Sequence, residues 1–374
     1  MKDNQIIQYE GGLIKRVGNA ISITNKLLAA AEPILIPYRK NEKWGFSTPD
    51  KKIVIDCDYD NVAPFSDGLA RVRTKEKYGF IDNKGNIIIP FIYDNVYSFD
   101  EGLAGLERNG KYGFIDKGTN TIIPYIYIYD DVSNFSEGYS SVKREKKYGI
   151  IDKFGYEIIP CVYNESIGFS EDLACVSENG KYGFIDKNGN KTIQCTYEYA
   201  GNFYEGMACV RNNTREYGFI DRNGNVIIPY LYDFPSSFSD GVACISLHLR
   251  GGYINKNGET LFRSELDSEN VVNYVFDFNF SEGLALVEKN NKYGFVNKSG
   301  NLIIPLIYDY ANDFSEGFAR VEINQKHGFI DKNGRMIIPC IYDYAFDFSK
   351  EYTQIEIDDK VGYIGKNGTE YWED

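Results

Sequence analysis

Short runs of alternating hydrophobic and polar residues follow one another along most of the chain. Residues 69–73 read Leu-Ala-Arg-Val-Arg, residues 77–82 read Lys-Tyr-Gly-Phe-Ile-Asp, and residues 87–89 are three isoleucines. Such alternation, bounded by turn residues, is typical of β-strands. Tight Gly-containing turns such as Lys-Asn-Gly-Asn at residues 187–190 favour hairpins. Pro90 then ends the third run, because proline cannot donate to a strand ladder. The pattern predicts a unit of three antiparallel strands.

This unit recurs through the sequence. A glycine, usually preceded by an aromatic residue, returns at intervals of 34, 34, 36, 34, 35, 34, 42, 34 and 34 residues. The glycines are Gly45, Gly79, Gly113, Gly149, Gly183, Gly218, Gly252, Gly294, Gly328 and Gly362. A fixed period of this kind is the signature of a repeat protein. We therefore predict an all-β fold, a tandem array of ten three-stranded β units of about 34 residues over residues 44–374.

One interval, of 42 residues, marks a unit that has been rewritten. Its additional residues lie within residues 259–279, where the Ile-Ile-Pro and Tyr-Asp phrases of the other units are missing. Arginine together with aromatic residues is typical of interface anchors, so we predict a binding surface here. The candidate binding residues are Phe262, Arg263, Tyr274 and Phe276, with His248 and Arg250 just before the rewritten unit. A passive surface loop is the alternative, because long insertions cost little entropy.

Residues 1–43 lie before the repeats and form a separate N-terminal segment. Residues 20–32 carry apolar side chains at helical spacing, with a possible cap at Asn19 and a stop at Pro33. We expect a short helix that caps the first unit, because the end of a stacked array has an apolar face to cover.

The charge balance narrows the functional classes. The chain has 41 Lys and Arg against 54 Asp and Glu, a net charge of −13. We do not expect nucleic acid as a partner, because neutralisation of phosphates is the main source of that affinity. No stretch of 18 apolar residues is present, so we expect no membrane insertion. The first residues do not resemble a secretion signal, and we expect a cytoplasmic protein.

Few side chains are available for catalysis or metal binding. The chain has two histidines, His248 and His327, and seven cysteines without a C-x-x-C spacing. We therefore expect no enzyme and no catalytic, metal-binding or cofactor-binding residues. We interpret His327 as a member of the aromatic column that precedes the repeated glycine.

Cysteine, aspartate and tyrosine recur at fixed positions of the unit. We interpret the cysteines as small buried thiols and the aspartates as caps of their own turns. Tyrosine precedes the repeated glycine at Tyr78 and Tyr182, for example, and precedes an aspartate at Tyr93 and Tyr308. We interpret both tyrosine columns as packing between units. Periodic aromatic ledges that stack on sugar rings or anchor a protein partner are the alternative.

The recurring phrases resemble a known family. An aromatic-Gly-Phe-Ile-Asp run, a Lys-x-Gly turn, Ile-Ile-Pro, and then Phe-Ser-Glu-Gly-Leu-Ala are similar to the WG repeats, or KWG repeats, of bacterial proteins. Residues 43–45, Lys-Trp-Gly, match that name literally, and the resemblance covers roughly residues 40–370. It implies a tandem β-repeat binding module and no shared catalytic residues.

Two architectures fit an array of such units. We favour an open, superhelical, solenoid-like stack, because propeller blades usually take about 40 to 45 residues and close with four to eight blades. β-Propeller-like rings are the alternative. For function, we expect a non-catalytic scaffold that mediates protein–protein interaction, because repeats supply surface without chemistry. A module that binds glycans or a cell-wall polymer through its periodic tyrosines is the alternative.

Overall fold

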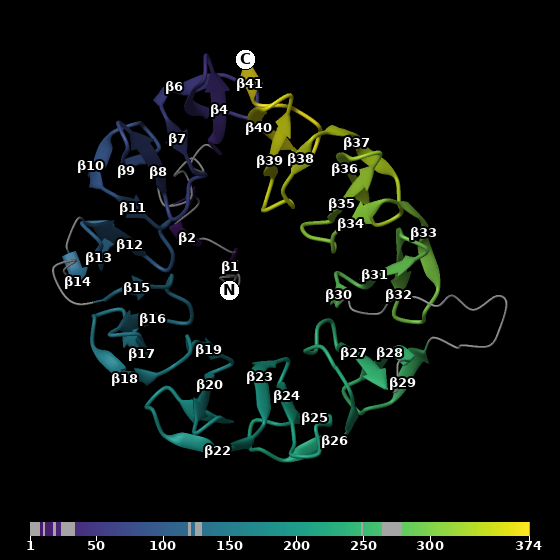
Figure 1. Ribbon diagram of the computed structural model, residues 1–374. Coiled ribbons are helices and arrows are strands. Elements are labelled where there is room, and N and C mark those ends of the chain that lie inside the picture. The colour runs from purple at the N-terminus through teal and green to yellow at the C-terminus, as the bar shows by residue number, and fades with distance from the viewer. Residues whose placement is uncertain are drawn as a thin grey trace.

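The computed structural model describes residues 34–118, 121–123, 129–247, 250–263 and 279–373, together with three strands nearer the N-terminus. In these described residues all regular secondary structure is β-strand. They contain no helix long and apolar enough to cross a membrane. Ten small sheets, counted over residues 36–373 where described, follow one another around a single closed ring (Figure 1). We number these sheets blades 1 to 10 in chain order.

Blade 1 contains β4 (Ile36–Lys40), β5 (Lys43–Ser47), β6 (Ile53–Tyr59) and β41 (Trp372–Glu373), and blade 2 contains β7 (Asn61–Val62), β8 (Leu69–Thr74), β9 (Lys77–Asp82) and β10 (Ile87–Tyr93). Blade 3 contains β11 (Asn95–Val96), β12 (Leu103–Arg108), β13 (Lys111–Asp116) and β14 (Thr121–Ile123), and blade 4 contains β15 (Asp131–Val132), β16 (Tyr139–Arg144), β17 (Lys147–Asp152) and β18 (Glu157–Tyr163). Blade 5 contains β19 (Phe169–Ser170), β20 (Leu173–Glu178), β21 (Lys181–Asp186) and β22 (Lys191–Tyr197).

Blade 6 contains β23 (Tyr199–Tyr204), β24 (Met207–Arg211), β25 (Tyr217–Ile220) and β26 (Val226–Tyr232), and blade 7 contains β27 (Val242–Leu247), β28 (Arg250–Asn255) and β29 (Thr260–Arg263). Blade 8 contains β30 (Phe280–Ser281), β31 (Leu284–Lys289), β32 (Lys292–Asn297) and β33 (Leu302–Tyr308), and blade 9 contains β34 (Tyr310–Ala311), β35 (Phe318–Ile323), β36 (Lys326–Asp331) and β37 (Met336–Tyr342). Blade 10 contains β38 (Tyr344–Ala345), β39 (Tyr352–Ile357) and β40 (Lys360–Gly365).

The predicted three-stranded unit is correct for the second, third and fourth strands of a blade. In blade 2 these are β8, β9 and β10, which pair antiparallel in chain order. Most blades add a short first strand, such as β7, which pairs with β8 and lies innermost in the ring (Figure 1). A first strand of two residues carries too little alternation to be recognised in a sequence.

The repeated glycine is explained by a close approach of backbone. At Gly183 an added Cβ would lie 2.5 Å from the carbonyl oxygen of Ile193 and 2.7 Å from the amide nitrogen of Cys195. Both belong to the fourth strand, β22, whose pairing with β21 shifts register beside this glycine. The bulge presses the fourth strand onto the third, so only glycine fits.

The hydrophobic core lies between the blades. Phe80 of β9 packs against Phe99, which precedes the second strand of blade 3, with ring centroids 4.8 Å apart. Ile89 and Tyr93 of blade 2 share the same cluster with Ala104 of blade 3. The phenylalanine of the Tyr-Gly-Phe phrase and that of the Phe-Ser-Glu-Gly phrase are therefore the two halves of one inter-blade contact.

Polar side chains repeat a second set of contacts between blades. The Ser66 hydroxyl donates to the carbonyl of Phe99 in the next blade at 2.8 Å. Glu101 accepts a hydrogen bond from the Gly138 amide of the next blade at 2.9 Å and pairs with Lys153 at 3.0 Å. The acidic residue of the Phe-Ser-Glu-Gly turn therefore joins neighbouring blades.

The aspartates at the end of the third strand cap their own turns, as predicted. Asp82 accepts hydrogen bonds from the amides of Lys84 and Asn86 at 2.9 and 2.8 Å. The aspartates between blades do more. Asp94 pairs with Lys77 of the preceding blade and also accepts the Asn109 amide at 2.6 Å in the following hairpin.

The expectation of an open stack is wrong, because the C-terminal strand closes the ring. β41 pairs parallel with β4 of blade 1, with Arg39 opposite Trp372. The ring of Trp372 lies over Gly362 of blade 10, where an added Cβ would be 2.1 Å from it. The closing strand lies outside the repeated phrase, so the repeat spacing does not reveal it.

The predicted N-terminal helix is also wrong where the structure describes it. Residues 20–23 form β3 (Ala20–Ile23), which pairs antiparallel with β2 (Gly12–Val17), and β1 (Gln8–Tyr9) pairs with β2 in the same way. Residues 24–32 lie outside the described residues. The start of the segment, Ala-Ile-Ser-Ile, alternates every two residues, and this local strand pattern prevails over the weaker helical spacing.

Candidate binding site

One repeat position near the start of a blade forms a column of side chains around the ring. It follows the residue that links two blades. In blades 2 to 5 the column is polar, and in four later blades it is aromatic. Its members are Asn61, Asn95, Asp131, Glu165, Tyr199, Phe234, Tyr310 and Tyr344. The change from polar to aromatic falls between blades 5 and 6, and two cavities lie on either side of blade 6.

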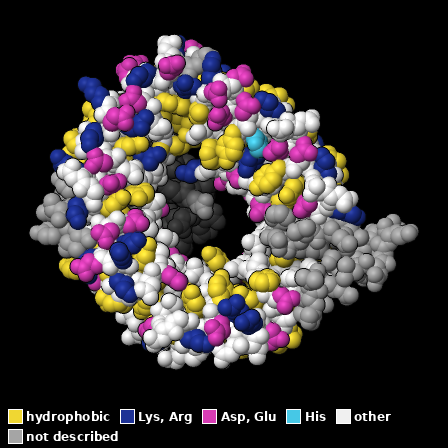
Figure 2. All heavy atoms as spheres, in the orientation of Figure 1, with side chains coloured by type: hydrophobic (Ala, Val, Ile, Leu, Met, Phe, Trp, Pro, Cys, Tyr) yellow, Lys and Arg dark blue, Asp and Glu magenta, His cyan; other side chains and the backbone are white. Residues whose placement is uncertain are grey.

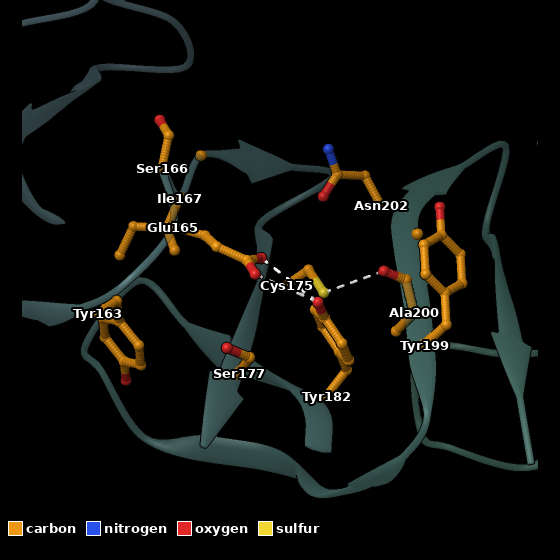
Figure 3. A pocket seen from close by; sticks show the side chains of 12 residues that line it. Tyr163, Glu165, Ser166, Ile167, Cys175, Ser177, Tyr182, Tyr199, Ala200 and Asn202 are labelled. Atoms are coloured by element: carbon orange, nitrogen blue, oxygen red, sulfur yellow. Dashed lines mark hydrogen bonds between the residues drawn. The ribbon is translucent and has the colours of Figure 1, made fainter. Parts of the chain in front are cut away.

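The first cavity has a volume of about 300 Å³ and lies between blades 5 and 6 (Figure 3). Its lining consists of Tyr163, Glu165, Ser166, Ile167, Gly168, Cys175, Ser177, Tyr182, Tyr199, Ala200, Gly201 and Asn202. The Tyr182 hydroxyl donates to Glu165 at 3.3 Å, and the Cys175 thiol donates to the carbonyl of Ala200 at 3.3 Å. The first bond joins two lining residues on the blade 5 side, and the second ties blade 5 to blade 6.

The second cavity, of about 490 Å³, lies between blades 6 and 7. It is lined by Tyr199, Gly201, Tyr204, Cys209, Pro235, Ser236, Ser237, Phe238, Ser239 and Asn279. The two cavities share Tyr199 and Gly201, so Tyr199 stands in the wall between them. We call the two cavities together the Tyr199 groove.

A row of aromatic rings supports Tyr199. Its ring centroid lies 6.1 Å from that of Tyr182 and 5.7 Å from that of Tyr217, and Tyr217 in turn lies 6.1 Å from Phe234. Contacts on both sides restrict the Tyr199 side chain, yet 42% of the residue stays exposed. The groove therefore presents a positioned ring to a ligand.

Burial keeps the two thiols of the groove neutral. It raises the pKa of the Cys175 and Cys209 thiols to about 12 each, so neither forms a thiolate near neutral pH. Burial also raises the pKa of Tyr182 and Tyr199 above the usual phenol value. The groove offers hydroxyls, amides and aromatic rings, and these are groups for binding.

The described residues contain no group of three or more His, Cys, Asp or Glu side chains placed to hold a metal ion. The seven cysteines form no disulfide and are buried or half-buried. Their positions agree with the interpretation of the cysteine columns as packed thiols.

The aromatic column differs in blades 9 and 10, where a buried arginine fills the space. The Arg320 guanidinium lies 5.8 Å from the ring of Tyr310 and 5.5 Å from that of Tyr344. It also contacts His327 Nδ1 at 3.3 Å and Asp347 at 3.4 Å. His327 lies at the position before the repeated glycine, as predicted, and its ring centroid lies 5.5 Å from that of Tyr344.

The structure places only part of the predicted binding surface. His248, Tyr274 and Phe276 lie outside the described residues. Arg250 opens β28 and Arg263 ends β29, and of these two the structure describes the backbone alone. Phe262 is half-buried on β29, with its ring centroid 5.0 Å from that of Tyr253.

Phe262 takes a position that isoleucine holds in other blades. It pairs with Tyr253 as Ile228 pairs with Phe219 in blade 6. The residues of the Tyr199 groove were missed in the sequence. The signal that would have found them is the change from Glu165 to Tyr199 at one repeat position.

The repeats match a family described as WG containing repeat. The matched ranges are residues 44–78, 78–112, 112–148, 148–182, 182–213, 217–247, 252–293, 293–326 and 328–360. The chain belongs to the WG-repeat family. Most of the matched repeats run from the third strand of one blade to the third strand of the next, so such a repeat combines half of one blade with half of its neighbour.

Several solved structures are similar to this chain at low sequence identity. A crystal structure described as the eukaryotic initiation factor is 9% identical, covers 90% of this chain and 95% of its own, and has a TM-score of 0.50. The computationally designed Ika8 protein is 10% identical over 73% of this chain and 93% of its own, at 0.41. BamB from Moraxella catarrhalis is 13% identical over 82% and 96%, at 0.35. No curated protein sequence matches the chain.

The likeness to the initiation factor structure concerns the fold alone. Together with the WG repeats, the ten-bladed ring indicates a β-propeller scaffold suited to interaction. Lys and Arg side chains are interspersed with Asp and Glu around the visible face of the ring (Figure 2). Mixed charge of this kind does not build the basic stripe that binds nucleic acid.

Proposed function

We propose that this WG-repeat protein is a non-catalytic scaffold that binds a protein partner on the outer rim of blades 8 and 9. The observation that carries the proposal is a set of exposed apolar side chains on the fourth strands β33 and β37. They are Leu302, Ile303, Ile307, Met336, Ile337 and Ile341, each between 39% and 53% exposed. Apolar groups gathered on neighbouring strands favour association with another protein.

The rim favours contact through side chains over the addition of a strand. β33 and β37 are outer strands with one open edge, and each carries a proline in its middle, Pro305 or Pro339. Proline supplies no amide donor, which disfavours pairing with a strand of another chain. A partner would therefore dock on the row of isoleucine and leucine side chains.

Blade 6 provides a matched comparison for the test. Its outer strand β26 exposes Val226, Ile227 and Leu231, but the outer strand of blade 5, β22, carries Lys191, Thr192, Gln194 and Thr196 in the corresponding run. The apolar surface of blade 6 is therefore bounded by a polar neighbour on one side.

The experiment replaces Ile303, Ile307 and Ile341 with serine in one variant, and Val226, Ile227 and Leu231 with serine in the control. A partner recovered from the native host is purified and titrated against each folded variant. We expect the blade 8–9 variant to weaken binding by at least about a hundredfold, as loss of several buried apolar anchors does, while the blade 6 variant binds as the parent does. Equal binding by all three proteins would reject the rim as the docking surface.

Glycan binding is a second candidate function, and a separate observation favours it. The Tyr199 groove combines a positioned tyrosine with serine and asparagine side chains and lies between consecutive blades. This candidate does not depend on the rim.

A further inference from the structure

The Tyr199 groove is two cavities that meet at one aromatic ring. Cavities of about 300 and 490 Å³ lie on either side of Tyr199, and both also border Gly201. Volumes of this size are those of small-ligand sites. We propose that the groove binds a linear neutral oligosaccharide, with sugar rings seated on both sides of Tyr199. The proposal is independent of a protein partner on the rim.

Tyr199 supplies the stacking surface. A sugar ring has a face of C–H bonds that packs on an aromatic ring, while the phenol hydroxyl remains available to the sugar's own hydroxyls. The neighbouring rings of Tyr182 and Tyr217, at 6.1 and 5.7 Å, hold Tyr199 in place. A side chain that is already positioned loses little conformational entropy when the ligand binds.

Gly201 keeps the groove open. A Cβ added there would lie 3.8 Å from the Cys209 carbonyl oxygen and 3.8 Å from the Tyr199 hydroxyl, which is ordinary van der Waals contact. The backbone of β23 therefore tolerates a side chain at this position. The glycine is not required by packing, in contrast to Gly183, where backbone atoms lie at 2.5 Å. A larger residue at position 201 would fill the groove and leave the fold intact.

The polar side chains of the groove match the hydroxyls of a neutral sugar. Ser166, Ser177 and Asn202 line the cavity next to blade 5, and Ser237 and Asn279 line the cavity next to blade 7. Hydroxyl and amide groups both donate and accept hydrogen bonds, as sugar hydroxyls do.

The charges of the groove select among sugars. Among the lining residues described, Glu165 is the charged side chain, and neither cavity includes Lys or Arg. A phosphorylated, sulfated or uronic-acid ligand would meet a carboxylate and no compensating cation. A neutral sugar meets no such penalty, and Glu165 can accept from its hydroxyls.

The arrangement of rings favours a sugar over a proline-rich peptide. Grooves that bind polyproline helices are lined by aromatic side chains that form ridges on which prolines dock. Here Tyr182, Tyr199 and Tyr217 contact one another in a single row. The row leaves Tyr199 as the one ring shared by two cavities, which suits flat rings placed in succession.

Tyr310 provides the matched control. It occupies the same repeat position as Tyr199, is 43% exposed, and contacts Tyr293 at 5.5 Å as Tyr199 contacts Tyr182. The Arg320 guanidinium lies 5.8 Å from the Tyr310 ring. The two tyrosines therefore differ in their surroundings and agree in position and exposure.

The test titrates the full chain with neutral probes, namely β-1,4-linked and α-1,4-linked glucose hexamers and the hexamer of N-acetylglucosamine, by calorimetry and by NMR. We expect saturable binding of at least one hexamer, and weaker binding of its dimer, because a dimer cannot occupy both cavities fully. Tyr199→Ala and Gly201→Val should each weaken binding by at least about tenfold, while Tyr310→Ala should bind as the parent does.

Three results would overturn the proposal. The first is the absence of saturable binding of every probe at about 10 mM, an affinity below about 3 kcal/mol. The second is binding that Tyr199→Ala and Gly201→Val leave unchanged while both variants melt as the parent does. The third is selection of a peptide from a random peptide library that competes for Tyr199, which would assign the groove to a peptide. The rim variants of blades 8 and 9 should bind the sugar normally, so the two proposals fail separately.

Discussion

The junction between blades 8 and 9 and the junction between blades 10 and 1 hold the same ring together by different contacts. At the first, Phe295 packs against Phe314 at 4.8 Å, and the Ser281 hydroxyl donates to the carbonyl of Phe314 at 2.6 Å. Glu282 accepts the Gly317 amide at 3.1 Å and pairs with Lys332 at 2.9 Å. The peptide chain also passes directly from one blade to the other.

The closing junction replaces this set with the last residues of the chain. Tyr371 is buried and donates its hydroxyl to the carbonyl of Pro49 at 3.3 Å. Glu373 accepts from the Tyr38 hydroxyl at 2.7 Å and pairs with Lys40 at 2.7 Å. Because no peptide bond joins blade 10 to β4, the closure depends on non-covalent contacts, which include these three and the pairing of β41 with β4. We refer to this junction as the seam.

The largest expected effect is the removal of the seam's tail. A chain that ends at Thr369 loses the buried ring of Tyr371 and the partly buried ring of Trp372, and the loss of a fully buried aromatic side chain costs about 3–5 kcal/mol. We expect a radius of gyration above that of the full chain in X-ray scattering and a melting temperature lower by more than about 10 °C. The variant Trp372→Phe keeps an aromatic ring and should stay closed. A truncated chain that scatters and melts as the parent does would show that the seam adds nothing to closure.

Alanine at two repeated glycines compares a regular blade with the seam. At Gly183 the new Cβ meets backbone of β22, and at Gly362 it meets the ring of Trp372. We expect both substitutions to destabilise the protein by about 1–3 kcal/mol, measured by urea unfolding. Hydrogen exchange should increase at residues 370–373 in Gly362→Ala and stay unchanged there in Gly183→Ala. Equal exchange of the tail in both variants would contradict the role of Gly362 in holding Trp372.

Acid should loosen the seam before the regular junctions, because at the regular junctions the peptide chain itself also passes from one blade to the next. The hydrogen bonds from Lys40 and Tyr38 hold the pKa of the Glu373 carboxyl below its ordinary value. Since an open tail takes up protons more readily, the contribution of Glu373 is present above about pH 4.5 and is lost as the pH falls through its lowered pKa. Both tryptophans of the chain, Trp44 and Trp372, lie at the seam, so tryptophan emission should change at a higher pH than the far-UV circular dichroism. Glu373→Gln should remove that early step, and coincident transitions in the parent would argue against it.

The smallest expected effect is that of removing one ion pair at a regular junction. Glu282→Gln keeps an acceptor for the Gly317 amide and loses the charge that faces Lys332. The pair is partly exposed, so we expect a loss below about 1 kcal/mol in the free energy of unfolding. Glu316→Gln, whose partner Lys366 lies at 3.3 Å, serves as a second regular junction. A loss above about 2 kcal/mol in the free energy of unfolding of either variant would mean that these ion pairs contribute more to closure than the seam does.

The regular parts of the fold were readable in the sequence because they repeat. The second, third and fourth strands, the Asp82-type turn caps and the glycine column each recur often enough to be recognised. Closure was not readable, since Trp372 and Glu373 occur once and pair with residues more than 300 positions away. The short first strands escaped notice because two residues, such as Asn61–Val62, show no alternation.

The candidate site shows the same division. The rewritten unit drew attention to Phe262, yet the structure places that side chain in the contact with Tyr253. The Tyr199 groove depends on one residue at one repeat position and on Gly201 beside it. Aligning the repeats reveals such a position only when the residue that differs from the other repeats is considered as well as the residues they share. The cavities themselves arise from the spacing of neighbouring blades, which the repeat length does not give.

The offset between the matched repeat and the blade bears on how such a ring changes size during evolution. A repeat that begins at Trp44 and ends at Tyr78 contains the outer half of blade 1 and the inner half of blade 2. Tandem duplication of one repeat in the gene would therefore insert one complete blade and leave β4 and β41 untouched. The two strands that pair at the seam, β4 and β41, lie outside the matched repeats. A ring of this kind can thus gain or lose blades one at a time while keeping the same seam.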